Sequence, residues 1–600
     1  MTVRSSTPTV WSALRFRGKV LALQSARAMR ELRGGARRFG KSGPRNRELL
    51  LAESVSALRA TDDRAGEPDR ALTLGKVHNL RLAVKRIDGA LVPANQTFSF
   101  WKQLGPATRR RGYVEGRELR EGCIVPSIGG GLCQLSNALY DAALRAGFEI
   151  VERHAHTAVV PGSLAEIGRD ATVFWNYVDL RFRVRRDVRI EAVVGADSLI
   201  VRYWGTAAGA AAAALVETAP LAPARPLPTG DCASCAVEDC FRHVVLHRRA
   251  ADAGRTAFLL DGYWPEYDTY VGAVAERSDT LFVPLDGRRR GLRNYRWNTG
   301  PVGSVRESPM LALLRSYRSR RLAQHGAARQ RSLLDWAHRI GEDFAARLPY
   351  DVTHVVIMQH LLPALWSAGA LGGRTYDVLM TGLPMRALQR TLDDAYALHP
   401  ESPTLNDFRA DAGLVEDEER ALAGARRIIT PHAAIAALFG SRALRLPWTA
   451  PRPEGLPGGA PLRDGSVLFP ASTLGRAGAY ELRDVARELG LHVTLTGPDL
   501  ESAGFWSGVA VERLAFEDAL LAASVVVLPA FVEHQPRRLL FAAAVQLPVV
   551  ASEACGLGEM AGVTTVPPGN VPALRAALQL AATSTLVSSS APTASGLIGR

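Results

Sequence analysis

The segment SIGGGLCQLSNALYDAALRAGFEIVERHAHTAVV, residues 127–160, determines the local fold of the N-terminal half of the chain. Its three glycines, Gly129 to Gly131, predict a tight turn whose backbone N–H groups can lie close to a bound group. The spacing i, i+4, i+7 and i+11 predicts one buried face of a following helix, formed by Leu135, Leu139, Ala142 and Ala146. Gly147 is a typical helix end, and the run FEIVER after it predicts a strand.

This pattern places Cys133 in the first turn of a helix, where the helix dipole and free N–H groups stabilise a thiolate. His154 and His156 follow at alternating positions and point to the same side if the strand continues through them. Asp170 or Asp179 supplies a carboxylate that could orient a histidine as a third member. The residue types and their order therefore predict a cysteine nucleophile with a histidine base.

The glycine turn, Gly129, Gly130 and Gly131, is expected to contact substrate and to donate N–H groups to an oxyanion, with Gln134 beside it. The alternative interpretation is that Cys133 is a small buried residue and that the histidines are hydrogen-bonded polar residues of the core. The sequence leaves both interpretations open.

A wider set of motifs surrounds this segment, namely NLRLAVKRIDG, FSFW, GYVEG, GGGLCQLSNALY, ERHAHT and GRDATV. In this order, over residues 76–184, they resemble the VanW family. The resemblance implies a cell-envelope and glycopeptide-resistance context and an α+β domain, but it implies no particular reaction. It spans less than a fifth of the chain.

Length and composition indicate a multidomain globular protein. The 600 residues are 47% hydrophobic and 22% charged, which excludes a disordered, collagenous or coiled-coil chain. The longest apolar run, residues 207–216, is too short to span a membrane, and no secretory signal is evident. We therefore expect a cytoplasmic protein.

The net charge of +14 is concentrated at the N-terminus, where residues 1–50 hold twelve Lys and Arg against Glu31 and Glu48. Apolar residues interleave with these charges, so residues 1–50 could contact an anionic membrane surface peripherally. A solvated basic helix is the alternative. Nucleic acid is not expected as a partner, because no aromatic or glycine pattern of a binding module accompanies the charge.

A compact cysteine cluster follows an Ala/Pro-rich linker. Its ligand types are spaced C-x2-C-x4-C-x2-H, with Cys232, Cys235, Cys240 and His243. Three thiolates and an imidazole fit a structural zinc site, and an iron–sulfur cluster with an outside ligand is the redox alternative. A set of reactive thiols, or chance, also accounts for the pattern.

The C-terminal half alternates short apolar runs with helix-length spacers. Such runs occur at 256–262, 280–285, 354–358, 376–382 and 427–430, and again at 466–472, 492–497, 524–530 and 548–552. This alternation predicts two parallel-sheet α/β domains.

The second of these domains resembles the GT-B glycosyltransferases of the retaining family-four type. The similarity lies in VLFPASTLGRAGAYELRDVARELG, HVTLTGPDLE, SVVVLPAFVEHQPRRLLFAAAVQLPVVASEACG and PPGNVPALRAALQ. It implies a nucleotide-sugar donor held by Glu533 and Arg476, with Arg537 and Arg538 as substitutes because the family's Arg and Lys of the opening loop are not both present. The alternative is that Glu533 is a solvated helix start and that the arginines form a surface. The family carries a second Glu eight residues after the first, where this chain has Phe541. A phenyl ring cannot bind ribose hydroxyls, so either the donor is held differently or the domain no longer transfers sugar.

The first α/β domain contains LLDGYWPEYDTY at 259–270, which places Asp261 and several aromatic residues after a predicted strand. A sugar could stack and be hydrogen-bonded there, whereas the alternative is a surface loop packed on its own domain. His360 and His432 follow other strands and are further polar candidates.

We expect the following organisation: a basic helical segment (1–60), a VanW domain (61–205), a linker (206–230), a cysteine cluster (231–245), two GT-B-like domains (246–450 and 451–577) and a disordered tail (578–600). The leading interpretation is an enzyme of envelope-glycan metabolism that transfers sugar from a nucleotide-sugar to a glycan or peptidoglycan precursor. One alternative is a cysteine hydrolase or acyltransferase centred on Cys133, with a degenerate C-terminal binding domain. Another is a non-catalytic glycan-binding or resistance accessory protein.

Overall fold

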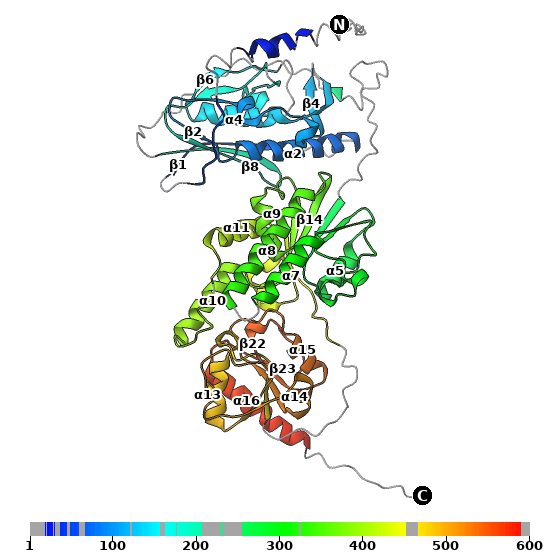
Figure 1. The fold of residues 1–600 in the computed structure, drawn as a ribbon, viewed down its shortest axis with the longest axis vertical. Helices are drawn as coiled ribbons and strands as arrows, with labels where there is room; N and C mark the ends of the chain where they lie inside the picture. Colours follow the sequence, from blue (N-terminus) through cyan, green and yellow to red (C-terminus); the bar gives the residue numbers. More distant parts are fainter. Residues whose placement is uncertain are drawn as a thin grey trace. The chain divides into compact units, whose positions relative to one another are not determined.

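The computed structural model of the chain separates into two compact units (Figure 1). Unit 1 comprises Met1–Thr256, Ala346–Val355 and Ala368–Thr375, and unit 2 comprises Ala257–Ala345, Val356–Ser367 and Tyr376–Arg600. The structure describes residues 18–19, 21–27, 29, 37–44, 48–58, 67–120, 123–156, 163–175, 177–206, 230–231, 255–322, 326–407, 409–451 and 466–589.

An antiparallel four-stranded sheet forms one layer of unit 1. Its order is β1-β9-β8-β2, with β1 Glu48–Ala57, β9 Ser198–Thr206, β8 Val188–Val194 and β2 Leu91–Val92. Helix α2 (Glu67–Ile87) packs on it because Val77, Leu80, Val84 and Ile87 repeat at helical spacing and are buried.

Two smaller sheets complete unit 1. The first has the antiparallel order β3-β7-β6, with β3 Thr97–Ser99, β7 Arg181–Arg183 and β6 Glu149–Glu152. The second has the order β10-β5-β4, with β10 Gly230–Asp231, β5 Cys123–Ile128 and β4 Glu115–Arg120. The short helices are α3 Phe100–Leu104, η1 Arg109–Arg111 and η2 Leu164–Ile167. The mixed α+β character predicted for this region is confirmed.

Helix α4 (Leu132–Arg145) occupies the middle of unit 1. Leu135, Leu139 and Ala142, on the predicted buried face, are fully buried. The hydroxyl of Tyr203 on β9 donates to the carbonyl of Leu139 at 2.9 Å and ties the helix to the four-stranded sheet. A rigid core therefore holds the N-terminus of α4, where Cys133 lies.

Unit 2 contains most of a seven-stranded sheet, ordered β13-β12-β11-β14-β15-β16-β17. Parallel pairing joins β12 to β11 and β13, and β16 to β15 and β17. The strands are β11 Arg255–Leu259, β12 Thr280–Val283, β13 Ser304–Glu307, β14 Val352–Met358, β15 Thr375–Leu379, β16 Arg427–Thr430 and β17 Ala443–Arg445. The helices are α5 Pro265–Val274, α6 Gly287–Arg290, α7 Pro309–Arg321, α8 Gly326–Arg347, α9 Leu362–Ser367, α10 Met385–Leu398, α11 Ala412–Ala423 and α12 Ala433–Phe439, with η3 Arg293–Tyr295, η4 Gln359–Leu361 and η5 Gly440–Arg442. We call this sheet with its helices the first lobe.

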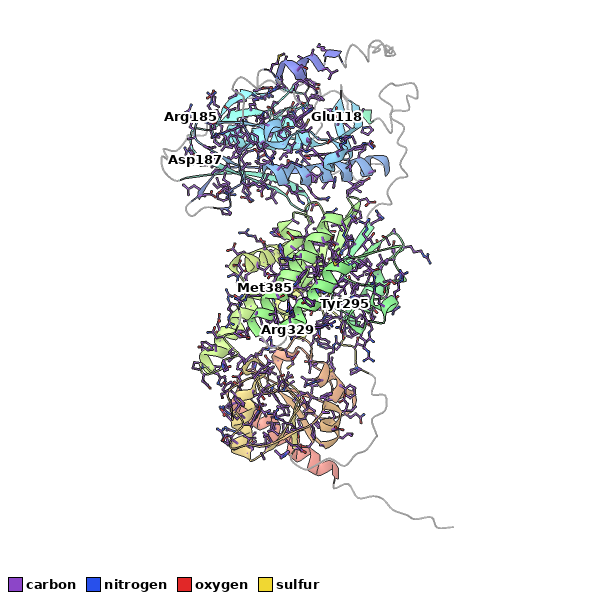
Figure 2. All side chains as sticks on the ribbon, viewed as in Figure 1. Glu118, Arg185, Asp187, Tyr295, Arg329 and Met385 are labelled. Carbon is purple, nitrogen blue, oxygen red and sulfur yellow. The ribbon has the colours of Figure 1, made fainter. Side chains whose placement is uncertain are left out.

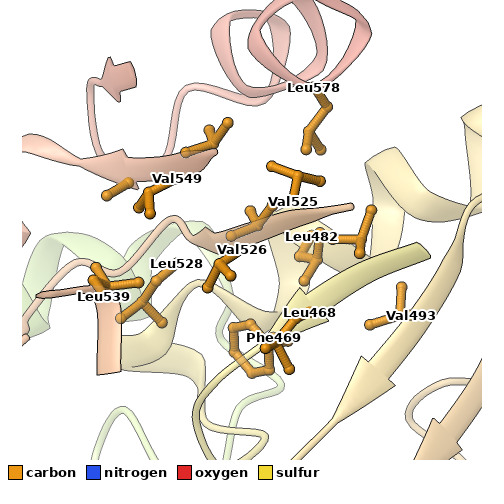
Figure 3. Packing of buried hydrophobic residues seen from close by; sticks show 14 of the residues in the cluster. Leu468, Phe469, Leu482, Val493, Val525, Val526, Leu528, Leu539, Val549 and Leu578 are labelled. Atoms are coloured by element: carbon orange, nitrogen blue, oxygen red, sulfur yellow. The ribbon is translucent and has the colours of Figure 1, made fainter. Parts of the chain in front are cut away.

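The second lobe is a parallel six-stranded sheet in the order β20-β19-β18-β21-β22-β23. Its strands are β18 Ser466–Phe469, β19 His492–Leu495, β20 Ala510–Arg513, β21 Val525–Leu528, β22 Val549–Ser552 and β23 Val563–Val566. Its helices are α13 Ala479–Leu489, α14 Phe516–Ala522, α15 Arg537–Ala544 and α16 Val571–Ser589, with η6 Gly475–Ala477 and η7 Glu553–Cys555. Figure 3 shows the core that these helices and strands share, with Leu468, Val526 and Val549 on the strands and Leu482 and Leu578 on the helices.

Both lobes have the Rossmann strand order, in which the chain starts at the centre and reverses direction across the sheet. The predicted pair of Rossmann-like parallel-sheet domains is confirmed. The order reverses between β11 and β14 in the first lobe and between β18 and β21 in the second. Ligands of open α/β sheets bind outside the strand ends at such a point.

Some local predictions differ from the structure. Residues 48–57, assigned to a helical segment, form strand β1, because they pair with β9 along its length. Helix α16 continues to Ser589 and buries Leu578, so it occupies the start of the segment predicted to be a disordered tail. The sequence missed β13, β17, β20 and β23, the outer strands of the two lobes, because they lack a continuous apolar run.

Candidate functional site

The strongest candidate site lies at the N-terminus of α4. Cys133 is the second residue of the helix, is half-buried, and has its sulfur 3.8 Å from the hydroxyl of Thr172. The helix begins after Gly131, whose φ is +99°, and no side chain caps its first turn. The N-terminal N–H groups of such a helix are available to a bound anion.

His156 and Asp170 complete this arrangement. The ring Nδ1 of His156 lies 2.5 Å from Asp170 Oδ1, and the backbone N–H of His156 donates to Asp170 Oδ2 at 2.5 Å. Cys133 lies near the same imidazole and is, with Asp170, one of the two residues that raise the pKa of His156. The structure therefore brings Cys133, His156 and Asp170 together in the order nucleophile, base and orienting carboxylate.

The charge state of His156 follows from these neighbours. Burial opposes a charge on the ring, but hydrogen bonds to Asp170 and Cys133 and the negative charge of these partners raise the pKa of His156 to about 10. At neutral pH the ring is therefore an imidazolium beside the sulfur.

Two residues of α4 that sequence reasoning missed hold Asp170 in place. The amide oxygen of Asn137 accepts from the backbone N–H of Ala171 at 2.7 Å, and the hydroxyl of Ser136 donates to the Ala171 carbonyl at 2.5 Å. Both residues are buried. Their signal in the sequence is two polar residues next to the apolar face of α4, three and four residues after Cys133.

The glycine turn has no room for side chains. A Cβ added to Gly130 would lie 2.3 Å from the carbonyl oxygen of Gly116, and one added to Gly131 would lie 2.3 Å from Cγ of Lys76. The Gly130 carbonyl also accepts from the side-chain amide of Asn79 at 3.0 Å. The backbone of β4, α2 and the turn thus approach one another so closely that only glycine fits.

A pocket of about 710 Å³ opens over Cys133 and His156. Its aromatic walls include Trp101 and Trp175, and its charged lining includes Lys76, Arg117 and Glu118. The predicted contacts also line it, namely Gly129, Gly130, Gly131 and Gln134. A pocket with apolar walls and a few convergent polar groups is the usual form of a small-ligand or peptide site.

Gln134 connects the pocket to the edge of the four-stranded sheet. Its side-chain nitrogen donates to the Ser56 hydroxyl at 3.0 Å and to the Ala57 carbonyl at 2.7 Å. Its side-chain oxygen is buried and, among the described residues, has no hydrogen-bond partner.

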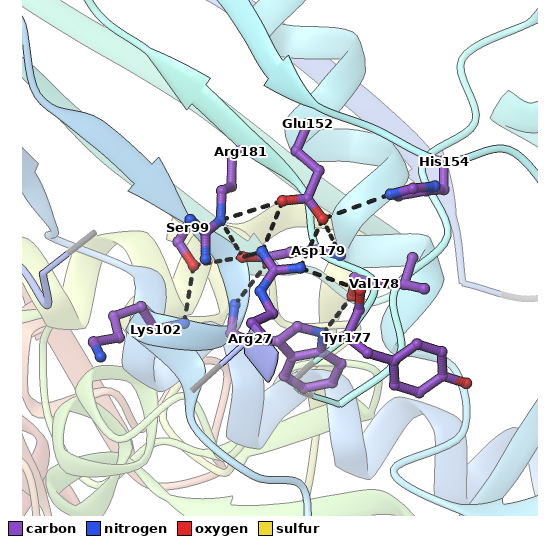
Figure 4. A network of polar contacts seen from close by, with 10 residues as sticks. Arg27, Ser99, Lys102, Glu152, His154, Tyr177, Val178, Asp179 and Arg181 are labelled. Carbon is purple, nitrogen blue, oxygen red and sulfur yellow. Dashed lines mark hydrogen bonds and ion pairs between the residues drawn. The ribbon is translucent and has the colours of Figure 1, made fainter. Parts of the chain in front are cut away.

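The other histidine and aspartate that the sequence proposed lie in a different network, shown in Figure 4. Asp179 binds Arg27, Arg181 and the Ser99 hydroxyl. His154 is about half-exposed and lies 3.5 Å from Glu152. Strand β6 ends at Glu152, so the strand does not continue through the two histidines, and the condition under which they would share a side is not met.

Unit 2 has a crevice of about 730 Å³ between its two lobes. It lies where both strand orders reverse, and its lining includes His360, Arg476, Glu533 and Arg538. His360 Nε2 is 2.8 Å from a carboxylate oxygen of the buried Asp261, which also forms a two-pronged ion pair with Arg315. Burial opposes ionisation, but Arg315 and His360 hold the pKa of Asp261 well below its usual range.

The three arginines predicted to contact the nucleotide-sugar donor differ in whether they already bind other residues of the protein. Arg537 forms a two-pronged ion pair with the buried Glu266, each contact 2.6 Å, so its charge is already matched. Arg538 donates to the carbonyl of Pro470 and the hydroxyl of Thr496. No described residue pairs with the guanidinium of Arg476, which lines the crevice.

Glu533 lines the crevice and accepts from the backbone N–H of Gln535 at 2.7 Å. Phe541 is on α15 and packs against the core of the second lobe, with its ring 6.0 Å from that of Phe516. The side chain at this position thus packs with the core, which explains why an aromatic residue is tolerated there.

The aromatic segment of the first lobe is largely part of the packing. Trp264 and Tyr267 are buried and stack on each other at 5.2 Å, and Pro265 begins α5. Asp261 is likewise buried by its partners. His432 is buried and donates to the carbonyls of Glu533 and Ala554, and burial lowers its pKa. His432 thus links the two lobes, whereas Asp261 and Tyr267 bond partners within the first lobe.

The cysteine cluster Cys232, Cys235, Cys240 and His243 lies outside the described residues. Within the part of the chain that the structure describes, no group of three or more His, Cys, Asp or Glu side chains could hold a metal ion. None of the helices described has the length and apolar character needed to cross a bilayer.

Residues 75–204 match the family model described as VanW like protein, and this region is a VanW-like domain. The region is similar to the protein YoaR of Bacillus subtilis strain 168, with 38% identity over 131 residues, 22% of this chain and 43% of that protein. It is also similar to the vancomycin B-type resistance protein VanW of Enterococcus faecalis, with 34% identity over 125 residues, 20% of this chain and 46% of that protein. The chain spans less than half the length of these relatives.

Solved structures match the other part of the chain. Sucrose-phosphate synthase from Thermosynechococcus elongatus is 14% identical, and the match covers 56% of this chain and 90% of that one with a TM-score of 0.34. The Anabaena protein HepE in complex with UDP and glucose is 15% identical, with 56% and 95% covered and a TM-score of 0.31.

Proposed function

We propose that the VanW-like domain is a thiol-dependent acyltransferase or hydrolase. The observation that supports this best is the contact of His156 with both Asp170 and Cys133 at the floor of the pocket. Cys133 is the nucleophile, His156 the general acid and base, and Asp170 the residue that orients and charges the imidazole.

The reaction has two steps. The Cys133 thiolate attacks the carbonyl of an acyl donor, and N–H groups of the glycine turn and α4 stabilise the resulting oxyanion. As the tetrahedral intermediate collapses, His156 donates its proton to the leaving amine, and an acyl-cysteine remains. An acceptor amine or water then attacks the acyl-cysteine and gives its proton to His156, which restores the thiolate and releases product.

Acylation itself prepares His156 for the second step. The negative charge of Cys133 is one of the factors that raise the pKa of His156, and acylation removes it. The ring, left neutral by proton transfer to the leaving amine, therefore has a lower pKa at this stage, stays neutral and acts as the base of the second step. Asp170 remains and keeps the ring oriented.

The acyl donor we infer is the peptide part of a peptidoglycan precursor. The name of the resistance relative supports an envelope context. The pocket has aromatic walls, cationic side chains and glycine backbone, which suit a carboxylate-bearing peptide.

A burst experiment tests the chemistry without knowledge of the natural substrate. With p-nitrophenyl acetate the protein should release p-nitrophenolate in a stoichiometric burst, and peptide mass spectrometry should find the acetyl group on Cys133. Cys133→Ser should show no burst. Cys555 is an internal control, because burial raises the pKa of its thiol to about 12. A burst that persists in Cys133→Ser, or an adduct elsewhere, contradicts the proposal.

The crevice of unit 2 supports a second candidate function, transfer of sugar from a nucleotide-sugar. It lies where the strand order of both sheets reverses, and Arg476 is part of its lining. Among the described residues, none forms an ion pair with the guanidinium of Arg476. The test is thermal unfolding with UDP or UDP-glucose. A ligand at 100 times its dissociation constant should stabilise the protein by about 2.7 kcal/mol. Arg476→Ala should abolish this effect and Arg390→Gln, on α10, should retain it. No stabilisation of the wild type by either ligand contradicts this function.

A further inference from the structure

Helix α7 presents an apolar stripe to solvent. Met310, Leu313, Leu314 and Tyr317 are 67%, 60%, 44% and 58% exposed, although they follow the i, i+3, i+4, i+7 spacing of a buried helix face. A globular protein rarely exposes several large apolar residues side by side without a binding role.

Contacts on the opposite side of α7 fix this orientation. Ala312 is buried, and Arg315 forms the two-pronged ion pair with Asp261. Turning the stripe inward would break that buried ion pair and leave Asp261 in the core without a matching charge. The loss of folding free energy would be several kcal/mol. The stripe is therefore a permanent feature of the surface of unit 2.

Positive charge lies at the C-terminal end of the stripe. The segment 286–335 holds twelve arginines against Asp286, Glu307 and Asp335, but Arg315 is paired with Asp261 and Arg290 with Glu307. The loop 288–296 contacts α7 on the side away from the stripe, where the Tyr295 hydroxyl accepts from Arg315 at 2.8 Å. Figure 2 labels Tyr295 and Arg329 on this unit. Arg318, Arg320 and Arg321, in the last turn of α7, are exposed.

A groove of about 480 Å³ adjoins the end of the stripe. It lies between α7 and α8, and its lining includes Arg318, Arg331, Arg339 and Trp336, together with one carboxylate, Asp335. Arginines over a tryptophan can hold a phosphate group next to an apolar surface. The apolar stripe, the basic rim and this groove form one continuous set of features, which we call the α7 face.

We propose that the α7 face docks on an anionic lipid surface. The stripe inserts among acyl chains near the headgroups while the arginines contact lipid phosphates, the division of labour of an interfacial amphipathic helix. A second copy of the chain is a poorer occupant, because it would bring like-charged arginine rims together. None of the residues of the α7 face belongs to residues 1–50 or lines either candidate site.

The experiment is co-sedimentation of the full chain with vesicles of phosphatidylglycerol and phosphatidylcholine, with pure phosphatidylcholine vesicles for comparison. Wild type should bind the anionic vesicles and lose binding as salt increases. Leu313→Ser/Tyr317→Ser and Arg318→Gln/Arg320→Gln/Arg321→Gln should each lower the partition coefficient at least about tenfold. All of these positions are exposed, so the variants should fold.

Matched controls are Leu438→Ser on α12, where the leucine is 56% exposed, and Arg390→Gln on α10. Both should bind like wild type. If the α7 variants also bind like wild type, the contact lies elsewhere, for example in residues 1–50, and the proposal is wrong. If light scattering shows that wild type is a dimer and the stripe variants are monomers, the occupant is a second copy and the proposal is likewise wrong.

Discussion

The two units each hold a histidine hydrogen-bonded to a buried aspartate, and they differ in what surrounds the pair. In unit 1, Asp170 faces His156 and the sulfur of Cys133 lies beyond the ring. In unit 2, Asp261 faces His360 but is also neutralised by both prongs of Arg315. The negative charge of Asp170 stabilises the imidazolium of His156, whereas the charge of Asp261 is already balanced by the guanidinium of Arg315. An Asp–His pair therefore indicates catalysis when its third neighbour is a nucleophile, and a structural role when that neighbour is an arginine.

The largest expected effect is on the chemistry of unit 1. Asp170→Asn keeps the shape of the side chain but removes the charge that favours the imidazolium, so the burst rate with p-nitrophenyl acetate should fall roughly 10³-fold. Stopped-flow measurement of p-nitrophenolate release gives this rate. Asp261→Asn should leave the rate unchanged. A similar loss in both variants, or in neither, would remove the distinction between the two pairs.

The corresponding change in unit 2 should affect folding. Asp261→Asn leaves Arg315 buried without a matching charge and should lower the stability of unit 2 by about 3–5 kcal/mol. Calorimetric unfolding measures this loss. Asp261→Asn/Arg315→Met removes both charges and should recover much of it. Equal stability of wild type and the single variant would show that the ion pair carries no structural role.

The pH dependence of stability should distinguish His156. Its pKa is about 10 in the folded protein and about 6.5 in an unfolded chain, so the folded state binds the proton more tightly. The resulting stabilisation is complete below about pH 6.5 and is lost as pH rises through about 10, at about 1.4 kcal/mol for each pKa unit.

Urea unfolding of unit 1 between pH 6 and 10 measures this loss. His156→Gln should flatten the profile over that range. A wild-type profile that rises with pH, or one that His156→Gln leaves unaltered, would contradict the ion-pair description of the site.

The smallest expected effect belongs to His154. It is about half-exposed and contacts Glu152 at 3.5 Å, so His154→Ala should change stability by less than about 0.5 kcal/mol and leave the burst rate within about twofold. Chemical denaturation and the burst assay test both. A large loss of activity in this variant would shift the role of base from His156 to His154.

The sequence predicted local elements well and long-range partners poorly. The turn at Gly129–Gly131, the buried face of α4 and the central strands of both lobes follow from spacing and apolar runs. The choice between His154 and His156 depends on strand β6 ending at Glu152, which no local pattern indicates. The partnership of Arg537 with Glu266 joins residues 271 positions apart, and it converts a predicted phosphate contact into a link between lobes.

The two aspartates near Cys133 illustrate the same limit. Asp170 and Asp179 are both buried and both follow the histidines, within residues 76–184 that carry the VanW resemblance. Asp179 accepts a hydrogen bond from Arg27, which is 152 positions away. Asn137 and Ser136 instead hydrogen-bond the backbone of the residue after Asp170 and hold that segment against α4. Only the tertiary structure decides between them.

The glycine turn also limits how this site can diversify over evolutionary time. No methyl group fits at Gly130 or Gly131, so the floor beneath the reacting sulfur cannot drift without displacing α2 and β4. The walls, formed by residues such as Trp101, Trp175 and Arg117, carry no such restriction. Descendants of this domain should therefore acquire new acyl donors by changing the walls, and they should inherit the chemistry of the floor unaltered.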